Sequence, residues 1–261
     1  MTATATTIIR RRRNGGRRAV RALGWLFLVA ALCVAGWMIW EIWGTSFLAS
    51  KAATEQLERF YAENGTAPDD DIPLHTDFNL YPPPFADMHV GGTWGVLHVP
   101  SWRGVTGVYG ETLDGLVPIA EGTTNAVLNK GWAAHFRVTA GVGQQGNFAL
   151  AGHRRTYGQN FLRVPELVPG YTVAVETPQT WYIYEVMDGS PHMVGKYDTT
   201  LLAPVPGDAT WSEPPTDRVL TLYTCTGRGW YAYENSHRAI VNARLVGWVE
   251  RDAGTPAAVR S

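Results

Sequence analysis

An uncharged run of 19 residues, 22–40, lies close to the N-terminus. A helix of that length is about 28 Å long at 1.5 Å per residue, which is close to the thickness of a bilayer's hydrocarbon core. Trp25 lies near the start of the run, and Trp37, Trp40 and Trp43 gather at its far end, as aromatic residues do at a membrane surface. We therefore predict one transmembrane helix over residues 22–43.

The flanking charges predict how this helix is oriented. Residues 1–21 contain seven arginines and no acidic residue, so the positive-inside rule keeps this tail in the cytoplasm and puts the rest of the chain outside. A cleaved signal peptide is the alternative, but its apolar region usually spans only about 7–15 residues before a small-residue cleavage site. Here the segment 37–43, with three tryptophans, follows instead. We expect an uncleaved, single-pass protein of the cell membrane.

The charge of the remaining chain limits its partners. Beyond the tail, 15 basic residues face 23 acidic ones, a net charge of −8. Nucleic-acid-binding proteins need a basic surface, so we expect no nucleic-acid partner. About 220 residues are enough for one domain with a substantial core.

The outer part divides by composition. Residues 46–63 have the composition of a helix that ends near Gly65, and residues 64–90 are rich in Pro and Asp, so we interpret 44–90 as a juxtamembrane helix and stalk. Residues 91–250 form the predicted domain, and 251–261 a solvated tail. Short apolar or alternating runs, separated by turn residues, predict an all-β barrel or sandwich. The expected strands are 94–99, 105–109, 117–119, 134–139, 147–152, 171–177, 180–188, 219–224 and 238–249, with short helices near 124–130 and 160–167.

Two cysteines are present, Cys33 in the apolar run and Cys225 in the domain. They fall in different compartments, so no disulfide within the domain is possible. Cys225 is then a buried inert thiol, an intermolecular crosslink or a reactive nucleophile.

Alternation along two predicted strands brings Cys225 near a cation. With a period of two, Cys225 lies on the face opposite Leu220 and Leu222, and Arg238 lies on the polar face of its own strand. If the two strands pair, Cys225 and Arg238 meet on one surface. A cation there lowers the pKa of a thiol and can hold an oxyanion. Arg228, in a glycine-flanked loop, is the rival cation.

His153 follows an apolar strand, where the chain turns after Gly152. Strand ends often carry catalytic groups, and a cysteine with a distant histidine is a candidate catalytic pair. A lone histidine is otherwise more often structural, so these residues alone leave its role open.

Several motifs in a fixed order resemble those of the sortases, membrane-anchored cysteine transpeptidases of Gram-positive bacteria. The motifs are Ala151-Gly152-His153-Arg154, Thr221-Leu222-Tyr223-Thr224-Cys225 and His237-Arg238-Ala239-Ile240-Val241, supported by residues 117–122 and 146–152. The resemblance implies a closed sortase-type β-barrel of about eight strands over residues 91–250. It also implies that Cys225 is the nucleophile, His153 the acid and base, and Arg238 the clamp for the oxyanion or substrate.

The resemblance also implies the reaction and its partners. Secreted proteins with a C-terminal sorting signal, Leu-Ala-x-Thr-Gly or Leu-Pro-x-Thr-Gly, are cut between Thr and Gly and joined to an amine of a peptidoglycan precursor. Residues 43–45 and 154–158 resemble class E, which favours the Leu-Ala form. Tyr157 and Thr224 are the expected substrate-binding residues; no cofactor or metal is expected. A thiol hydrolase with the same three residues, and a non-catalytic domain that binds surface polymers, are the alternatives.

Overall fold

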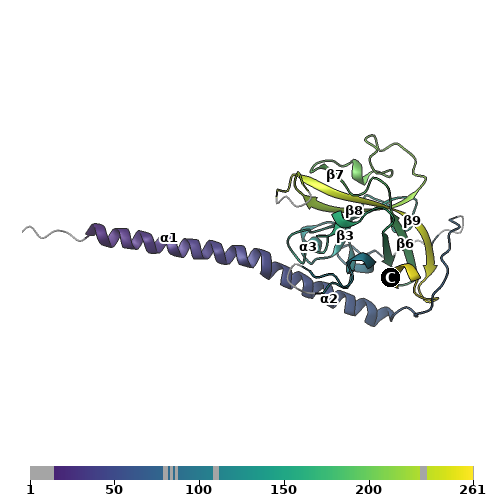
Figure 1. The fold of residues 1–261 in the computed structure, drawn as a ribbon, viewed down its shortest axis with the longest axis horizontal. Helices are drawn as coiled ribbons and strands as arrows, with labels where there is room; N and C mark the ends of the chain where they lie inside the picture. The colour runs from purple at the N-terminus through teal and green to yellow at the C-terminus, as the bar shows by residue number, and fades with distance from the viewer. Residues whose placement is uncertain are drawn as a thin grey trace, which may run out of the picture.

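A continuous helical rod leads into a β-barrel (Figure 1). The computed structural model describes residues 15–78, 82, 85, 88–107, 112–229 and 234–260. The rod consists of α1 (Gly15–Ile39), the π-helical turn η1 (Trp40–Gly44) and α2 (Thr45–Asn64). Backbone angles stay helical at both joints, at Ile39 and at Thr45, so the axis passes from α1 into α2 without a break.

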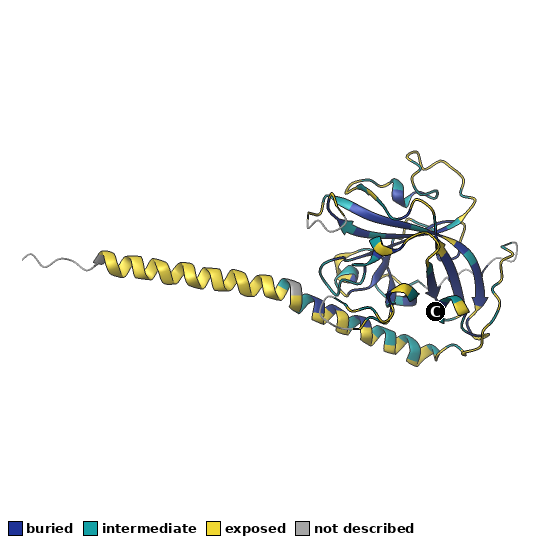
Figure 2. Cartoon of the chain, in the orientation of Figure 1, coloured by how far each residue is buried: buried dark blue, intermediate teal, exposed yellow. Residues whose placement is uncertain are grey.

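The first part of the rod stands away from the barrel and the second lies along it (Figures 1 and 2). Within α1, the 24 residues Gly16–Ile39 are long and apolar enough to cross a membrane, and none of the apolar window is buried. In α2, Ser46, Ala49 and Ala53 are buried against the domain. The predicted helix over 46–63, with an end near Gly65, is confirmed.

Nine strands make up the sheet in the part of the chain that the structure describes. They are β1 (Thr93–His98), β2 (Leu116–Glu121), β3 (Ala133–His135), β4 (Gly146–Gly152), β5 (Thr172–Glu176), β6 (Thr180–Val186), β7 (His192–Gly195), β8 (Arg218–Thr226) and β9 (His237–Glu250). Their order is β6-β5-β1-β2-β3-β4-β8-β9-β7, and β6 also pairs with β9. That pairing closes a barrel of eight strands and leaves β7 outside on β9, which confirms the expected closed barrel.

Helices in the domain are short. They are η2 (Pro100–Trp102), α3 (Asn125–Leu128), η3 (Val164–Glu166), η4 (Thr200–Leu202) and α4 (Ala257–Arg260). The helix expected near 124–130 is present as α3, whereas 160–167 forms turns and the single 3-10 turn η3.

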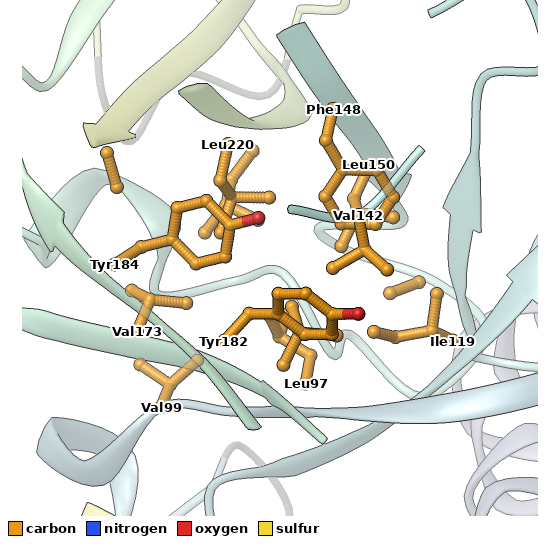
Figure 3. Close-up of a cluster of buried hydrophobic side chains, with 14 of the residues drawn as sticks. Leu97, Val99, Ile119, Val142, Phe148, Leu150, Val173, Tyr182, Tyr184 and Leu220 are labelled. Carbon is orange, nitrogen blue, oxygen red and sulfur yellow. The ribbon is translucent and has the colours of Figure 1, made fainter. Parts of the chain in front are cut away.

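The core fills the inside of the barrel (Figure 3). Side chains from many strands meet there, with Leu97 of β1, Leu150 of β4, Tyr184 of β6 and Leu220 of β8 almost fully buried. The phenolic oxygen of Tyr184 accepts a hydrogen bond of 3.1 Å from the backbone N–H of Gly143, so its polar end is satisfied inside the core.

Three strand predictions differ from the structure. The strand expected over 134–139 ends at His135, as the three-residue β3, and residues 137–139 form a turn and a bend. Residues 105–107 form no strand, because Thr106 makes only an isolated bridge to Thr112; part of that expected strand, 108–109, lies outside the described residues. Strand β7 was not expected, since four residues are too few to show a pattern of alternation.

The segments on either side of the domain pack against it. Ala67, Ile72 and Leu74, expected in a stalk, join an apolar cluster with Val249 and Val259. Val259 belongs to α4 and is 2% exposed, so the C-terminal segment expected to be solvated folds back onto the barrel instead. Apolar side chains scattered among Pro and Asp residues provide that contact.

A buried ion network joins the end of α2 to the barrel. The Glu176 carboxylate accepts hydrogen bonds from Arg251 Nε at 2.6 Å and from the Tyr61 hydroxyl at 2.9 Å, and it lies 2.8 Å from His98 Nε2. Burial alone raises the pKa of Glu176, but the hydrogen bonds and charges of His98 and Arg251 outweigh it, so this pKa is lowered. Arg251 also donates to the backbone carbonyl of Asn64 at the end of α2.

Candidate active site

Cys225 and Arg238 lie opposite each other on paired strands. In the antiparallel pair β8–β9, Cys225 is the partner of Arg238, and residues directly opposite point to the same face. Leu220 and Leu222 point into the core, which confirms the alternation expected along β8. Cys225 is a free, half-buried thiol, while Arg238 is only 7% exposed.

Hydrogen bonds hold the Arg238 guanidinium in place. Its Nε donates to the Tyr223 hydroxyl at 2.6 Å, and its Nη1 donates to Asn235 Oδ1 at 2.6 Å and to the His237 carbonyl at 2.8 Å. Toward the described residues, Nη2 makes no hydrogen bond. The guanidinium is thus fixed by two of its three nitrogens.

The strand that ends at His153 runs beside the cysteine strand. β4 and β8 are parallel, with Gly152 opposite Thr224, so the residues that follow are His153, just past the end of β4, and Cys225 within β8. A Cβ at Gly152 would lie 2.5 Å from the Phe161 ring, so this position accepts only glycine. The ring packs over the strand end and fixes where the chain turns into His153.

His153 is covered by a polar and an aromatic neighbour. Its Nε2 lies 3.0 Å from Asn129 Oδ1, and the Tyr157 ring stacks on the imidazole with centroids 5.0 Å apart and planes 29° apart. Burial lowers the pKa of His153 below its ordinary value, because desolvation disfavours the imidazolium. With Oδ1 of Asn129 as acceptor, Nε2 carries a proton and Nδ1 is the nitrogen left for proton exchange.

The remaining residues predicted for the site differ in their burial and in their distance from His153 and Cys225. Tyr157 lies directly against His153. Thr224 is fully buried, and its hydroxyl donates to the Gly152 carbonyl at 2.8 Å, so it ties β8 to β4 and does not face a groove. Arg228 has an 85% exposed side chain and pairs only loosely with Glu234, at 3.8 Å.

Sequence reasoning missed several supporting residues. Arg154 is 2% exposed and donates to Thr226 Oγ1 at 2.7 Å, which joins the ends of β4 and β8 next to the site. Its position next to His153 in the motif 151–154 was the sequence feature that could have indicated a role for Arg154. Asn129 had no such feature, because it lies in a loop 24 residues before His153. Asn235 lies only three residues before Arg238, but no pattern in its sequence predicts that its side chain contacts the guanidinium.

A buried polar chain reinforces the three strands. Asn242 of β9 donates to Thr221 Oγ1 of β8 at 2.8 Å, and Thr221 donates to Asn147 Oδ1 of β4 at 2.7 Å. The Asn147 amide donates on to the carbonyls of Leu201 and Ala203. Asn242, Thr221 and Asn147 lie on the strand faces that carry Cys225 and Arg238, so the chain fixes strand register beneath the site.

The arrangement suits acyl transfer. A thiol, an imidazole and a fixed guanidinium gather at one end of three adjacent strands, which are the groups needed for nucleophilic attack, proton transfer and oxyanion stabilisation. Among the residues described, no group of three or more His, Cys, Asp or Glu side chains is placed to hold a metal ion.

Comparison with known proteins decides the family. The sortase domain family model matches residues 111–246, more than half of the chain. The chain belongs to the sortase family. Sortases are cysteine transpeptidases, and the order of the motifs around Cys225, His153 and Arg238 is consistent with that membership.

Individual sortases are also similar to this chain in sequence and in structure. SrtE1 and SrtE2 of Streptomyces coelicolor are each 27% identical, over 93% and 91% of this chain, and the match spans 62% and 87% of their own lengths. Among solved structures, the SrtA sortase from Actinomyces oris is 38% identical, with a TM-score of 0.62, over 72% of this chain and 97% of that one. Sortase E from Streptomyces avermitilis is 35% identical, with a TM-score of 0.52, over 66% and 99%.

Proposed function

We propose that this sortase is a membrane-anchored transpeptidase in which Cys225 is the nucleophile, His153 the acid and base, and Arg238 the oxyanion clamp. One observation carries the assignment: Cys225 is paired with Arg238 on β9 and lies beside the strand end that leads into His153. The substrates are secreted proteins with a C-terminal sorting signal, cut between Thr and Gly.

In the first half-reaction Cys225 attacks the carbonyl carbon of the signal's Thr. His153 takes the thiol proton as the S–C bond forms, because its lowered pKa keeps the imidazole neutral near pH 7. Arg238, through Nη2, stabilises the negative carbonyl oxygen. The imidazolium then gives its proton to the glycine nitrogen, the C–N bond breaks, and a thioester remains on Cys225.

In the second half-reaction an amine of a peptidoglycan precursor replaces the leaving amine. The amine attacks the thioester carbon, His153 accepts its proton, and the S–C bond breaks as a new amide forms. Arg238 again stabilises the oxyanion. The thiol then regains a proton from His153, so the enzyme is restored with no net change.

The sorting signal is proposed to be of the Leu-Ala-x-Thr-Gly type. Support comes from the relatives named SrtE1 and SrtE2 and from the class E resemblance at residues 43–45 and 154–158. Tyr157, stacked on His153, is the residue best positioned to line the signal's groove.

The anchor is proposed to be α1, with the N-terminus in the cytoplasm and the barrel outside. The supporting observations are the fully exposed apolar helix Gly16–Ile39 and the seven arginines before residue 22. Protease added to intact protoplasts is expected to remove the barrel and spare the N-terminal tail. A mature protein that begins beyond residue 40 would instead indicate a cleaved signal peptide.

The decisive experiment combines full-length protein in detergent micelles with Leu-Ala-x-Thr-Gly or Leu-Pro-x-Thr-Gly peptides, with and without an added amine. Mass spectrometry is expected to detect the peptide up to Thr joined to the amine, and a thioester on Cys225 when the amine is absent. Hydrolysed peptide alone, even with excess amine, would indicate a thiol hydrolase. No turnover and no alkylation of Cys225 would indicate a binding domain.

A further inference from the structure

Ala49, on the face of α2 that meets the barrel, lies against two glycines of the loops around His153. A Cβ built on Gly131 would lie 3.4 Å from the Ala49 Cβ, and one on Gly158 would lie 3.5 Å from it. Ala49 is 1% exposed. The helix that follows the apolar segment therefore lies close to the site region, and a side chain at either glycine would meet the Ala49 methyl.

One helical turn later, Ala53 packs against the first of these loops. It belongs to a small apolar cluster with Val127 and Trp132, separate from the main core. These two residues flank Asn129, the residue whose Oδ1 lies 3.0 Å from His153 Nε2. Through Ala49 and Ala53, α2 thus fixes the loop that supports one side of the imidazole.

The second loop is strained. Tyr157, Gly158 and Gln159 are three successive residues with φ of 51°, 86° and 54°, in the left-handed region that only glycine adopts readily. Such conformations persist only where the surrounding packing enforces them. The Ala49 methyl packs on the middle residue of the three, and the Asn160 side chain donates to the Gly131 carbonyl, which ties the two loops together.

This strained turn determines how His153 is covered. The Tyr157 ring, at the start of the turn, stacks on the imidazole, and burial of the imidazole lowers its pKa. If the turn relaxes, the ring moves away and water reaches His153. The packing of α2 is therefore linked to both the position and the proton affinity of the imidazole.

We propose that α2 is a positioning element for His153: Ala49, packed between Gly131 and Gly158, holds the strained turn 157–159 and the Asn129 loop in their working arrangement. This inference rests on the proposed role of His153. It makes the juxtamembrane helix part of the apparatus for catalysis and not only a spacer.

The test uses full-length protein in detergent micelles and the peptide-plus-amine assay. Ala49→Leu forces α2 away from both glycines, so kcat is expected to fall about tenfold or more with little change in KM for the peptide. The acidic limb of the pH profile of kcat/KM should move to higher pH, because the hydrated imidazole has a higher pKa. Ala49→Ser keeps the small size and is expected to retain most activity.

Two controls separate this effect from general loosening of the helix. Ala62→Leu adds the same three carbons at an exposed position of α2 and is expected to change neither kcat nor the pH profile. Tyr61→Phe removes the hydrogen bond to Glu176 at the far end of α2, so it should lower the melting temperature without moving the pH profile.

Two further single variants, each an alanine of α2 changed to glycine, test the proposal if Ala49→Leu does not fold. Ala49→Gly and Ala52→Gly weaken the helix equally, but only Ala49→Gly removes the contact with the two loops. When the two variants are compared at the same distance from their melting temperatures, the kcat of Ala49→Gly is expected to be several-fold lower than that of Ala52→Gly. Equal kcat and equal pH profiles in this pair would overturn the inference.

His153→Gln in the same assay separates this inference from the proposed function. An inactive His153→Gln together with fully active Ala49 variants would refute only the role of α2. An active His153→Gln would refute the proposed function itself.

Discussion

The Thr224 hydroxyl donates a hydrogen bond of 2.8 Å to the Gly152 carbonyl, and this bond joins the strand of Cys225 to the strand that ends at His153. Both residues are one position before the residues proposed to react, on parallel strands in register. A small change at either one shifts the nucleophile relative to the imidazole.

Thr224→Val keeps the shape of the side chain and removes that bond. The free energy of unfolding is expected to fall by about 1–3 kcal/mol, the cost of leaving a buried group unpaired, and kcat should fall with KM nearly unchanged. Steady-state kinetics and thermal melting measure both. A rise in KM at constant kcat would instead favour direct substrate binding by Thr224, as the sequence alone predicted.

Cys225→Ala should abolish transpeptidation and leave the barrel folded, because the thiol is half-buried and makes no bond that holds the sheet together. Circular dichroism checks the fold, and mass spectrometry checks the product. Cys33→Ala is the matched control: the residue lies on the exposed surface of α1, so activity in micelles should be unchanged. Residual joining of peptide to amine by Cys225→Ala would refute the assignment.

Arg238→Lys keeps a positive charge but loses the planar fork that Tyr223 and Asn235 hold. We expect kcat to fall by a factor on the order of 10² to 10³, as for loss of one oxyanion donor, with a small change in KM. Arg228→Ala removes an exposed loop cation and should be mild. The opposite ranking of these two variants would move the clamp to the loop.

The lowered pKa of His153 makes stability depend on pH. Below the unfolded value, about 6.5, the unfolded chain binds a proton that the folded chain does not, so the free energy of unfolding decreases as pH falls from that value toward the lower folded pKa. His192, whose pKa burial also lowers, contributes in the same direction. We therefore expect the melting temperature to fall between pH 7.5 and 5.5, and to fall less in His153→Gln. An equal decrease in both proteins would show that His153 does not contribute.

Glu176→Gln tests the buried network that fixes the end of α2. The change leaves Arg251 buried without its carboxylate, and loss of one partner of a buried ion pair typically costs about 3–5 kcal/mol. Thermal melting should show a large decrease. Glu250→Gln removes an exposed carboxylate beside His75 and should have almost no effect. Similar melting temperatures for the two variants would show that the network contributes little.

Strand alternation is what made the Cys225–Arg238 pair predictable, since a period of two fixes which side chains share a face once the strands pair. The neighbourhood of His153 and Cys225 is different: it depends on a parallel pairing between residues about 70 positions apart, which no local pattern encodes. Only the resemblance to sortases predicted that His153 and Cys225 belong to one site. Composition likewise predicted α2 but not its buried face, because Ala49 differs from Ala52 only in what it meets after folding.

Because the path from α1 through η1 into α2 is unbroken, it fixes both the direction in which the barrel faces around the α1 axis and its distance along that axis. Each helical residue adds about 1.5 Å and turns the chain by roughly 100°. One inserted residue in this path would turn the Cys225 face to another side of the α1 axis and shift it by only about 1.5 Å, whereas seven would shift it about 10 Å and nearly restore the direction. The number of residues in the rod therefore fixes both how far the catalytic face stands from α1 and which side of the α1 axis it faces.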